Sequence, residues 1–261
     1  MLLSIDIGNT NIVMGVYKGD ILIEHWRLKT DSYRTTNEYW VIFNSLYEFS
    51  HITPSDIQGV IVSSVVPTLT DALKELCLKY FHIDPLFVES GIKTGMPIVM
   101  DSPKEVGADR IVNAIAAYDR FKSSCIVVDF GTATTFDIIS NQGEYLGGVI
   151  TPGIEISAEA LFAKTAKLPR VEFEKPRQVV GKNTIDSIKS GIVNGYTSLV
   201  DGVVERIFKE QGYECPVIST GGCCNIIAQN SSTIQVVDEL LTLKGLKIIY
   251  ERNMKAKKAL R

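Results

Sequence analysis

The sequence predicts an α/β protein built from two copies of one domain, each with a mixed sheet flanked by helices. Two observations predict this fold. Each half of the chain begins with a strand, an Asp-Xaa-Gly turn and two further strands, and continues with alternating helices and strands. The 261 residues, with 45% hydrophobic content, can form two packed cores of ordinary size. We expect one domain over residues 1–118 and a second over residues 119–261.

Composition and charge argue against several other classes of protein. The net charge of -3, with both signs interspersed, is not that of a nucleic-acid-binding surface. Asp6 interrupts the apolar start too early for a signal peptide, and no apolar stretch is long enough to span a bilayer. The five cysteines and three histidines lack the spacing of a disulfide framework or a zinc site. We therefore expect a cytoplasmic protein with no membrane and no nucleic-acid partner.

Three strands and a capped helix open the first half. Apolar runs predict strands over residues 1–7, 12–17 and 21–28, joined by turns. Thr35 and Glu38, three residues apart, form a capping-box pattern that begins a helix. The apolar residues of this helix fall on one face, and they are Tyr39, Ile42, Phe43 and Leu46.

The rest of the first half alternates strands and helices. A continuous apolar run predicts a buried strand over residues 59–65. Pro67 suits the first turn of a following helix. The core stripe of that helix is Leu69, Leu73, Leu76 and Tyr80. A short strand over residues 85–88 precedes an irregular segment rich in Gly and Pro, after which a helix begins at residues 107–110 and ends near Lys122.

The second half repeats this outline. Strands are expected over residues 124–129, 134–139 and 145–151, with a turn between the last two. The elements expected after them are helices over residues 154–162 and 184–209, a strand over 216–220, a short helix from Gly222, a strand over 234–237 and a closing helix from about Leu243.

The two Asp-Xaa-Gly turns carry the chemistry that the sequence suggests. In Asp6-Ile7-Gly8-Asn9-Thr10 and Asp129-Phe130-Gly131-Thr132, an apolar strand delivers a carboxylate to a turn whose Gly lets the backbone approach a ligand closely. Turn amides and Thr hydroxyls suit phosphate oxygens, whereas the carboxylates suit cations or ordered water that screen the phosphate charge. A single copy would read as an ordinary hairpin turn, but two copies at equivalent points favour a phosphate site. No P-loop and no dinucleotide fingerprint offers another route.

Five motifs in order resemble the type III pantothenate kinases over nearly the whole chain. They are the Asp6–Thr10 opening, Val106-Gly107-Ala108-Asp109-Arg110, Asp129-Phe130-Gly131-Thr132-Ala133-Thr134, the segment from Gly147 to Gly153, and Thr220-Gly221-Gly222. Each motif alone is weak, whereas their combination is specific. These kinases belong to the superfamily of acetate and sugar kinases, Hsp70 and actin, so the resemblance implies two ribonuclease H-like, actin-like ATPase domains.

The resemblance also implies an activity and its residues. A homodimer would phosphorylate pantothenate at its 4′-hydroxyl with ATP, the first step of coenzyme A synthesis, with Mg²⁺ and a monovalent cation, K⁺ or NH₄⁺. Asp109 would accept the proton, Asp129 would bind K⁺ and Asp6 would act on Mg²⁺ indirectly. The implied nucleotide contacts are Asp6, Ile7, Gly8, Asn9, Thr10, Asn11, Ile12, Val13 and Thr132. The implied pantothenate contacts are Met100, Gly107, Ala108, Asp109, Arg110 and Thr184.

Asp109 and Arg110 can also be interpreted from their positions. Asp109 stands in the first turn of a helix beside Arg110, which favours its ionised form, so we expect an available but weak base that acts late in phosphoryl transfer. A helix cap is the alternative role for Asp109. Arg110 could clamp the pantothenate carboxylate or pair with Asp109 or Glu105.

Two positions depart from the family pattern. Met100 stands where members often carry Tyr, so a side-chain hydrogen bond to pantothenate is not available there. Cys223 and Cys224 follow the Gly-Gly pair where smaller aliphatic residues are usual, and they suit either buried hydrophobic positions or a redox-sensitive adenine pocket. That Gly pair could let adenosine lie against bare backbone, or it could be a plain strand-to-helix turn.

Two other functions are compatible with the same residues. The chain could be a catalytically silent ATP-binding regulatory protein, because the superfamily includes proteins that use ATP to drive domain movement. It could also be a kinase of another hydroxylated substrate, such as a sugar. The presence of Asp109 together with both phosphate turns favours the enzyme.

Overall fold

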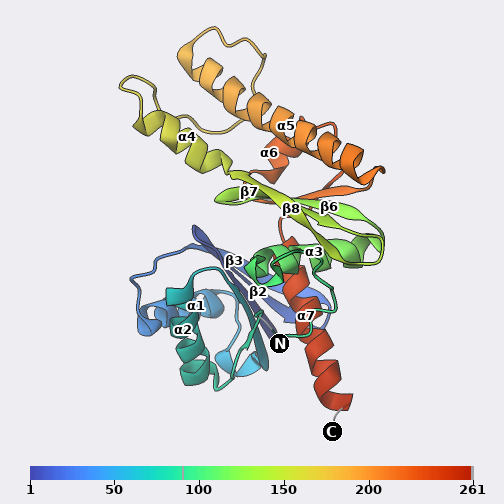
Figure 1. Cartoon of the computed structure of the whole chain (residues 1–261). Coiled ribbons are helices and arrows are strands. Elements are labelled where there is room, and N and C mark those ends of the chain that lie inside the picture. The colour runs from blue at the N-terminus through green and yellow to red at the C-terminus, as the bar shows by residue number, and fades with distance from the viewer. Residues whose placement is uncertain (90, 260–261) are drawn as a thin grey trace. The chain divides into compact units, whose positions relative to one another are not determined.

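The computed structural model describes residues 1–89 and 91–259, and their contacts divide the chain into two units (Figure 1). The first unit contains Met1–Met96, Asp101–Ala116 and the closing segment from Thr242. The second unit contains Pro97–Met100 and Ala117–Leu241. Among the described residues, no helix is long and apolar enough to cross a membrane.

A five-stranded mixed sheet forms the centre of the first unit, in the order β3-β2-β1-β4-β5. Tight turns join β1, β2 and β3, so these strands are antiparallel, whereas helical crossovers make β4 and β5 parallel to β1. The bounds are β1 (Leu2–Ile7), β2 (Asn11–Lys18), β3 (Ile21–Lys29), β4 (Gly59–Ser64) and β5 (Leu86–Phe87).

Helices cover both faces of this sheet. α1 (Thr36–Phe49) and α2 (Pro67–Leu76) bury Tyr39, Phe43 and Leu73 against the apolar face of β1, β2 and β4. The predicted capping box begins α1, because the Thr35 amide donates to Glu38 Oε2 (2.8 Å) and the Glu38 amide donates to Thr35 Oγ1 (3.4 Å). α3 (Ala108–Phe121) starts in this unit, and α7 (Leu241–Ala259) packs on the opposite face of the sheet.

One predicted helix ends earlier than expected. Leu69, Leu73 and Leu76 are buried as the stripe predicts, but after α2 the chain makes a π-helical turn over Cys77–Phe81 and ends at His82 with φ 56°. A π turn contains more residues than an α turn, which displaces Tyr80 from the stripe. Tyr80 instead stacks on Trp40, with ring centroids 4.2 Å apart.

The second unit repeats the first. Its sheet has the order β10-β9-β6-β7-β8, which is the same topology read from the other edge. The bounds are β6 (Cys125–Phe130), β7 (Ala133–Ile139), β8 (Tyr145–Pro152), β9 (Val217–Gly221) and β10 (Val236–Val237). α4 (Ile154–Ala163), α5 (Thr184–Gln211) and α6 (Cys224–Ala228) pack against the apolar face of this sheet. The prediction of a duplicated α/β fold is confirmed.

The unit to which the closing helix belongs differs from the predicted division of the chain between residues 118 and 119. α7 contacts the first unit, although it follows the second in sequence. A Cβ atom at Gly15 would lie 2.7 Å from Leu243 Cδ1, and one at Gly59 would lie 1.9 Å from the Tyr250 hydroxyl oxygen. Bare backbone in the sheet therefore accepts side chains of α7, a match between distant residues that sequence adjacency does not indicate.

Gly245 of α7 lies directly against Val112 of α3, and we predict that Gly245→Ala destabilises the fold. The added Cβ would lie 2.1 Å from the Val112 carbonyl oxygen, so the backbone of one helix would have to shift. We expect the free energy of unfolding to fall by about 1–3 kcal/mol in urea titrations. Gly202→Ala in α5, where a Cβ meets open space, should instead raise it by about 0.5–1 kcal/mol. A Gly245→Ala protein as stable as the unchanged protein would contradict this packing.

Candidate functional site: two equivalent turns and a helix aspartate

The first Asp-Xaa-Gly turn joins β1 to β2. Ile7 pairs with Ile12 at the end of the ladder, and the Gly8 amide closes the turn by donating to the Asn11 carbonyl oxygen (2.9 Å). Ile7 and Ile12 are fully buried, whereas Asn9 and Thr10 are exposed at the tip. The side chains of the two isoleucines are thus committed to the core, and only the tip is open to a ligand.

The second turn joins β6 to β7 in the equivalent place. Phe130 pairs with Thr134, and the Gly131 amide donates to the Ala133 carbonyl oxygen (3.1 Å). Thr132 is exposed at the tip. This turn spans residues 131–133 between its last paired residues, against residues 8–11 in the first turn, so it is one residue shorter.

The two aspartates occupy matching positions in their sheets. Asp6 lies beside Ser63 of β4, and Asp129 lies beside Thr220 of β9. Each aspartate stands one residue before the last pair of its hairpin. Because side chains alternate along a strand, both carboxylates lie on the face opposite the apolar core formed by their neighbours. A carboxylate is acceptor-only, so it can face phosphate only through a cation or water.

Gly221 makes room for the carboxylate of Asp129. Its φ is 90°, and a Cβ at this position would lie 2.7 Å from Asp129 Oδ1 and 2.6 Å from the Phe130 carbonyl oxygen. The following amide of Gly222 donates to that carbonyl (3.1 Å). The predicted Gly-Gly segment is therefore bare backbone against the second turn. The short helix predicted from Gly222 begins two residues later, since α6 begins at Cys224.

These residues fit cations that share their ligands with a nucleotide. Within residues 1–89 and 91–259, no three His, Cys, Asp or Glu side chains gather as a ready-made metal cage. Each turn instead offers one carboxylate, and the cradle at Gly221 leaves the carboxylate of Asp129 unobstructed by a side chain at that position. Mg²⁺ typically takes one or two carboxylates, with phosphate and water as its other ligands.

Asp109 lies in the first turn of α3 and is half-buried. The Arg110 amide donates to Asp109 Oδ1 (2.8 Å), and a Cβ at Gly107 would lie 2.5 Å from the same oxygen, so Gly107 lets the carboxylate fold back on the backbone. Burial raises the pKa of Asp109 above its ordinary value, although the Arg110 amide and the Arg110 charge lower it. Desolvation therefore outweighs the neighbouring charge and the backbone amide in setting the direction of this shift.

Thr184 lines a cavity of about 710 Å³ in the second unit. It follows Asn183, whose side chain caps α5 by accepting from the Asp186 amide (2.9 Å). Tyr196 and Ser157 supply polar groups from α5 and α4. The apolar lining is Ala158, Leu161, Leu168, Ile188 and Ile192.

The remaining predicted residues are divided between the units. Asp6 and the Gly107–Arg110 segment belong to the first unit, whereas Met100, Asp129, Thr132 and Thr184 belong to the second. Met100 is half-buried in the short segment that joins the second unit.

The paired cysteines after Gly222 are buried, which favours their hydrophobic role. Burial raises the pKa of Cys224 to about 12 and raises that of Cys223 as well. A thiol of raised pKa holds little thiolate at neutral pH and is a poor target for oxidation. The burial of the two thiols therefore does not support a redox-sensitive pocket at these residues.

Each turn is held by the segment that follows the third strand of its sheet, a feature that the sequence analysis did not single out. The Thr30 amide donates to the Thr10 carbonyl oxygen (2.9 Å), and the Gly153 amide donates to the Thr132 carbonyl oxygen (3.0 Å). Only an alignment of the two halves on their strands could have indicated this, because Thr30 and Gly153 each follow the last residue of β3 or β8.

The family model and the sequence relatives all point to one family. A family model described as type III pantothenate kinase matches residues 2–206. Type III pantothenate kinase of Myxococcus xanthus is 52% identical over 253 residues, with 97% of this chain and 99% of the relative covered. The enzyme of the same name from Geobacter sulfurreducens is 53% identical with the same coverage.

Solved structures show the fold at low sequence identity. A conserved putative Baf family transcriptional activator from Campylobacter jejuni has a TM-score of 0.60 and 21% identity, with 97% of this chain and 99% of that chain covered. MreB 5 of Spiroplasma citri, bound to AMPPNP, has a TM-score of 0.56 and 11% identity, with 100% and 98% covered. A putative 2-dehydro-3-deoxygalactonokinase from Sinorhizobium meliloti has a TM-score of 0.56 and 10% identity, with 97% and 96% covered. The two units thus have the ribonuclease H-like fold of the actin-like ATPases.

Proposed function

Since the chain belongs to the type III pantothenate kinase family, we propose that its two Asp-Xaa-Gly turns hold the phosphates of ATP and that Asp109 accepts the proton of the substrate hydroxyl. The chain is a phosphotransferase that phosphorylates pantothenate to 4′-phosphopantothenate with ATP, in coenzyme A biosynthesis. The observation that carries the residue assignment is the equivalence of the two turns, each with its carboxylate one residue before the end of a hairpin.

The nucleotide is assigned to residues 6–13 and to Thr132. Asn9, Thr10 and Thr132 are exposed at the turn tips, and turn amides and hydroxyls of this kind suit phosphate oxygens. Ile7 and Ile12 contribute backbone alone, because their side chains are in the core. The bare backbone of Thr220-Gly221-Gly222 suits the adenosine.

Asp129 is assigned to the monovalent cation, K⁺ or NH₄⁺, and Asp6 to Mg²⁺ through water. When bound, these cations neutralise charge that builds up on the transferred phosphoryl group. The carboxylates hold the required charge on the face of each sheet that is free of the apolar core.

Asp109 is assigned as the proton acceptor, with Gly107, Ala108 and Arg110 around the substrate. A carboxylate that is poorly solvated binds a proton more tightly, so its raised pKa makes Asp109 a better base than an exposed aspartate. The backbone hydrogen bond from Arg110 to Oδ1 fixes the orientation of the carboxylate at the start of α3. Thr184, with the cavity that it lines, and Met100 are assigned to pantothenate as well.

A homodimer is proposed through α5. Ser187, Gly191, Gly195 and Ser198 form a stripe of small exposed residues along this helix, and a Cβ at either glycine would meet open space. Val179 and Val180 are 75% and 77% exposed beside it. Small residues let a second helix approach closely, and the exposed valines would gain burial from a second copy of the chain. The cytoplasmic location stays a prediction.

We predict that Asp109→Asn abolishes turnover while ATP binding survives. Purified protein with ATP, Mg²⁺ and K⁺ should convert pantothenate to phosphopantothenate, and the variant should lose at least about 10²-fold in kcat. Asp119→Asn on the same helix, where Asp119 pairs with Lys122, is the matched control and should keep full activity. The melting temperature of Asp109→Asn at pH 7 should hold or rise, because a raised folded-state pKa means that the ionised form opposes folding above that pKa. Full activity in the variant, or turnover of a sugar in place of pantothenate, would contradict the assignment.

The pH dependence of kcat/KM provides a second test of Asp109 as the base. A protonated carboxyl cannot accept the hydroxyl proton, so kcat/KM for pantothenate should fall on the acid side with a midpoint above about 3.9, the value for exposed aspartate. Because the Arg110 charge lowers the pKa of Asp109, Arg110→Gln should move that midpoint to higher pH. A midpoint that stays in place or moves down in Arg110→Gln would show that another group titrates.

Gly195→Leu tests the dimer. The single chain has room for the side chain, so the fold should survive while a helix–helix contact is blocked. Light scattering after size-exclusion chromatography should give a dimer for the unchanged protein and a monomer for the variant. Val41→Trp, at an exposed position of α1, is the control and should stay dimeric. An unchanged protein that is monomeric at micromolar concentration would contradict the proposal.

A further inference from the structure

A tyrosine hydroxyl from α1 fixes the segment that holds the first turn. Thr30 makes two hydrogen bonds to that turn, from its amide to the Thr10 carbonyl oxygen (2.9 Å) and from its hydroxyl to the Gly8 carbonyl oxygen (2.7 Å). The backbone amide and the backbone carbonyl of the next residue, Asp31, both form hydrogen bonds with the Tyr39 hydroxyl. The Tyr39 hydroxyl donates to the Asp31 carbonyl oxygen (2.8 Å) and accepts from the Asp31 amide (3.1 Å).

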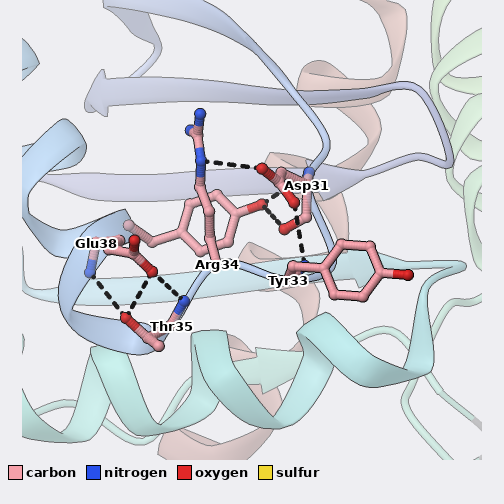
Figure 2. A network of polar contacts seen from close by, with 6 residues as sticks. Asp31, Tyr33, Arg34, Thr35 and Glu38 are labelled. Carbon is pink, nitrogen blue, oxygen red and sulfur yellow. Dashed lines mark hydrogen bonds and ion pairs between the residues drawn. The ribbon is translucent and has the colours of Figure 1, made fainter.

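Further polar contacts surround Asp31 (Figure 2). The Asp31 side chain accepts from the Tyr33 amide (3.1 Å) and pairs with Arg34 (3.4 Å), and the capping box of α1 follows directly. Tyr39 is fully buried, and burial raises its pKa, so the hydroxyl keeps its proton at neutral pH and can donate. The turn is thereby connected through Thr30 and Asp31 to the core of α1.

The second unit holds its turn by the same kind of contact from a different helix. Gly153 donates its amide to the Thr132 carbonyl oxygen, and a Cβ at Gly153 would lie 2.4 Å from the carbonyl oxygens of Gly131 and Thr132. The Tyr196 hydroxyl of α5 is 3.0 Å from the Gly153 carbonyl oxygen and 3.1 Å from that of Pro152. It is also 2.6 Å from Ser157 Oγ, in the first turn of α4.

We propose that Tyr39 and Tyr196 are positioning residues for ATP: each hydroxyl fixes the backbone after the third strand of its sheet, and that backbone fixes one phosphate-binding turn. The inference rests on the proposed function of the turns. The turn tips are exposed, and a hydrogen bond to a tip carbonyl also fixes the direction of the amide on the same peptide. Donors that are fixed before the ligand arrives lose less freedom on binding and stabilise developing charge more strongly.

The experiment compares ligands that differ in phosphate. Tyr39→Phe and Tyr196→Phe remove one hydroxyl each and keep the ring in place. In calorimetric titrations of the full chain, each variant should bind ADP about three- to tenfold more weakly, the loss expected for one to two ordinary hydrogen bonds. Adenosine should bind with unchanged affinity, because it has no phosphate to reach the turns. The double variant should show the product of the two effects, because the tyrosines hold different turns.

Two tyrosines serve as matched controls. Tyr47 lies on α1 like Tyr39, and its buried hydroxyl has no hydrogen-bond partner among the described residues, so Tyr47→Phe should bind ADP normally. Tyr213 follows α5 and is 39% exposed, and Tyr213→Phe should also be neutral. Thr30→Val removes the hydroxyl bond to Gly8 without touching a tyrosine and should weaken ADP, not adenosine.

The outcomes separate this inference from the function. Tyr39→Phe and Tyr196→Phe proteins that bind ADP as well as Tyr47→Phe would overturn the positioning role while leaving the kinase assignment intact. Equal losses for ADP and adenosine, with a lowered melting temperature, would also overturn it, because they indicate general damage. An unchanged protein that binds adenosine but gains nothing from the phosphates of ADP would overturn the assignment of the turns, and this inference with it.

Discussion

One backbone hydrogen bond occurs once in each unit, and the arrangement of the site depends on it. The amide that follows the third strand donates to a carbonyl of the Asp-Xaa-Gly turn, from Thr30 to Thr10 and from Gly153 to Thr132. This bond joins the far strand of the meander to the tip of the first hairpin, so the tip is fixed at both of its sides. The bond extends the pairing of β2 with β3 and of β7 with β8 by one position, whereas the pairing within the first hairpin stops at Ile7 and at Phe130.

Much of this fold follows from local patterns, since they act over short distances. The apolar runs give the strands of both meanders, and Thr35 with Glu38 gives the start of α1, because each depends on residues within one turn or one hairpin. The duplication could also be predicted from the sequence, because an Asp-Xaa-Gly turn occurs in each half at the same point in the order of elements. The candidate residues themselves came from the motifs and the family that they resemble, and which of them contact ligand stays a prediction.

The features that the sequence did not predict depend on contacts between residues that lie far apart in the chain. The attachment of α7 requires Gly15 and Gly59 to match Leu243 and Tyr250, and no local signal connects them. The pKa of Asp109 depends on how much solvent the folded chain removes, which its two neighbours in sequence could not indicate. The same desolvation that opposes the folded state when Asp109 is ionised makes it a stronger proton acceptor, so stability and reactivity are set against each other at one carboxylate.

The position of α7 also has a consequence for synthesis of the protein. A ribosome releases the chain from its first residue onward, and domains generally fold as they emerge. The second unit is contained within residues 97–241, so all of it is available before α7 has been made. Until then the backbone of Gly15 and Gly59 lacks its contacts with Leu243 and Tyr250, which follow the second unit in sequence. The unit whose synthesis begins first can therefore be completed only after the other unit has been translated.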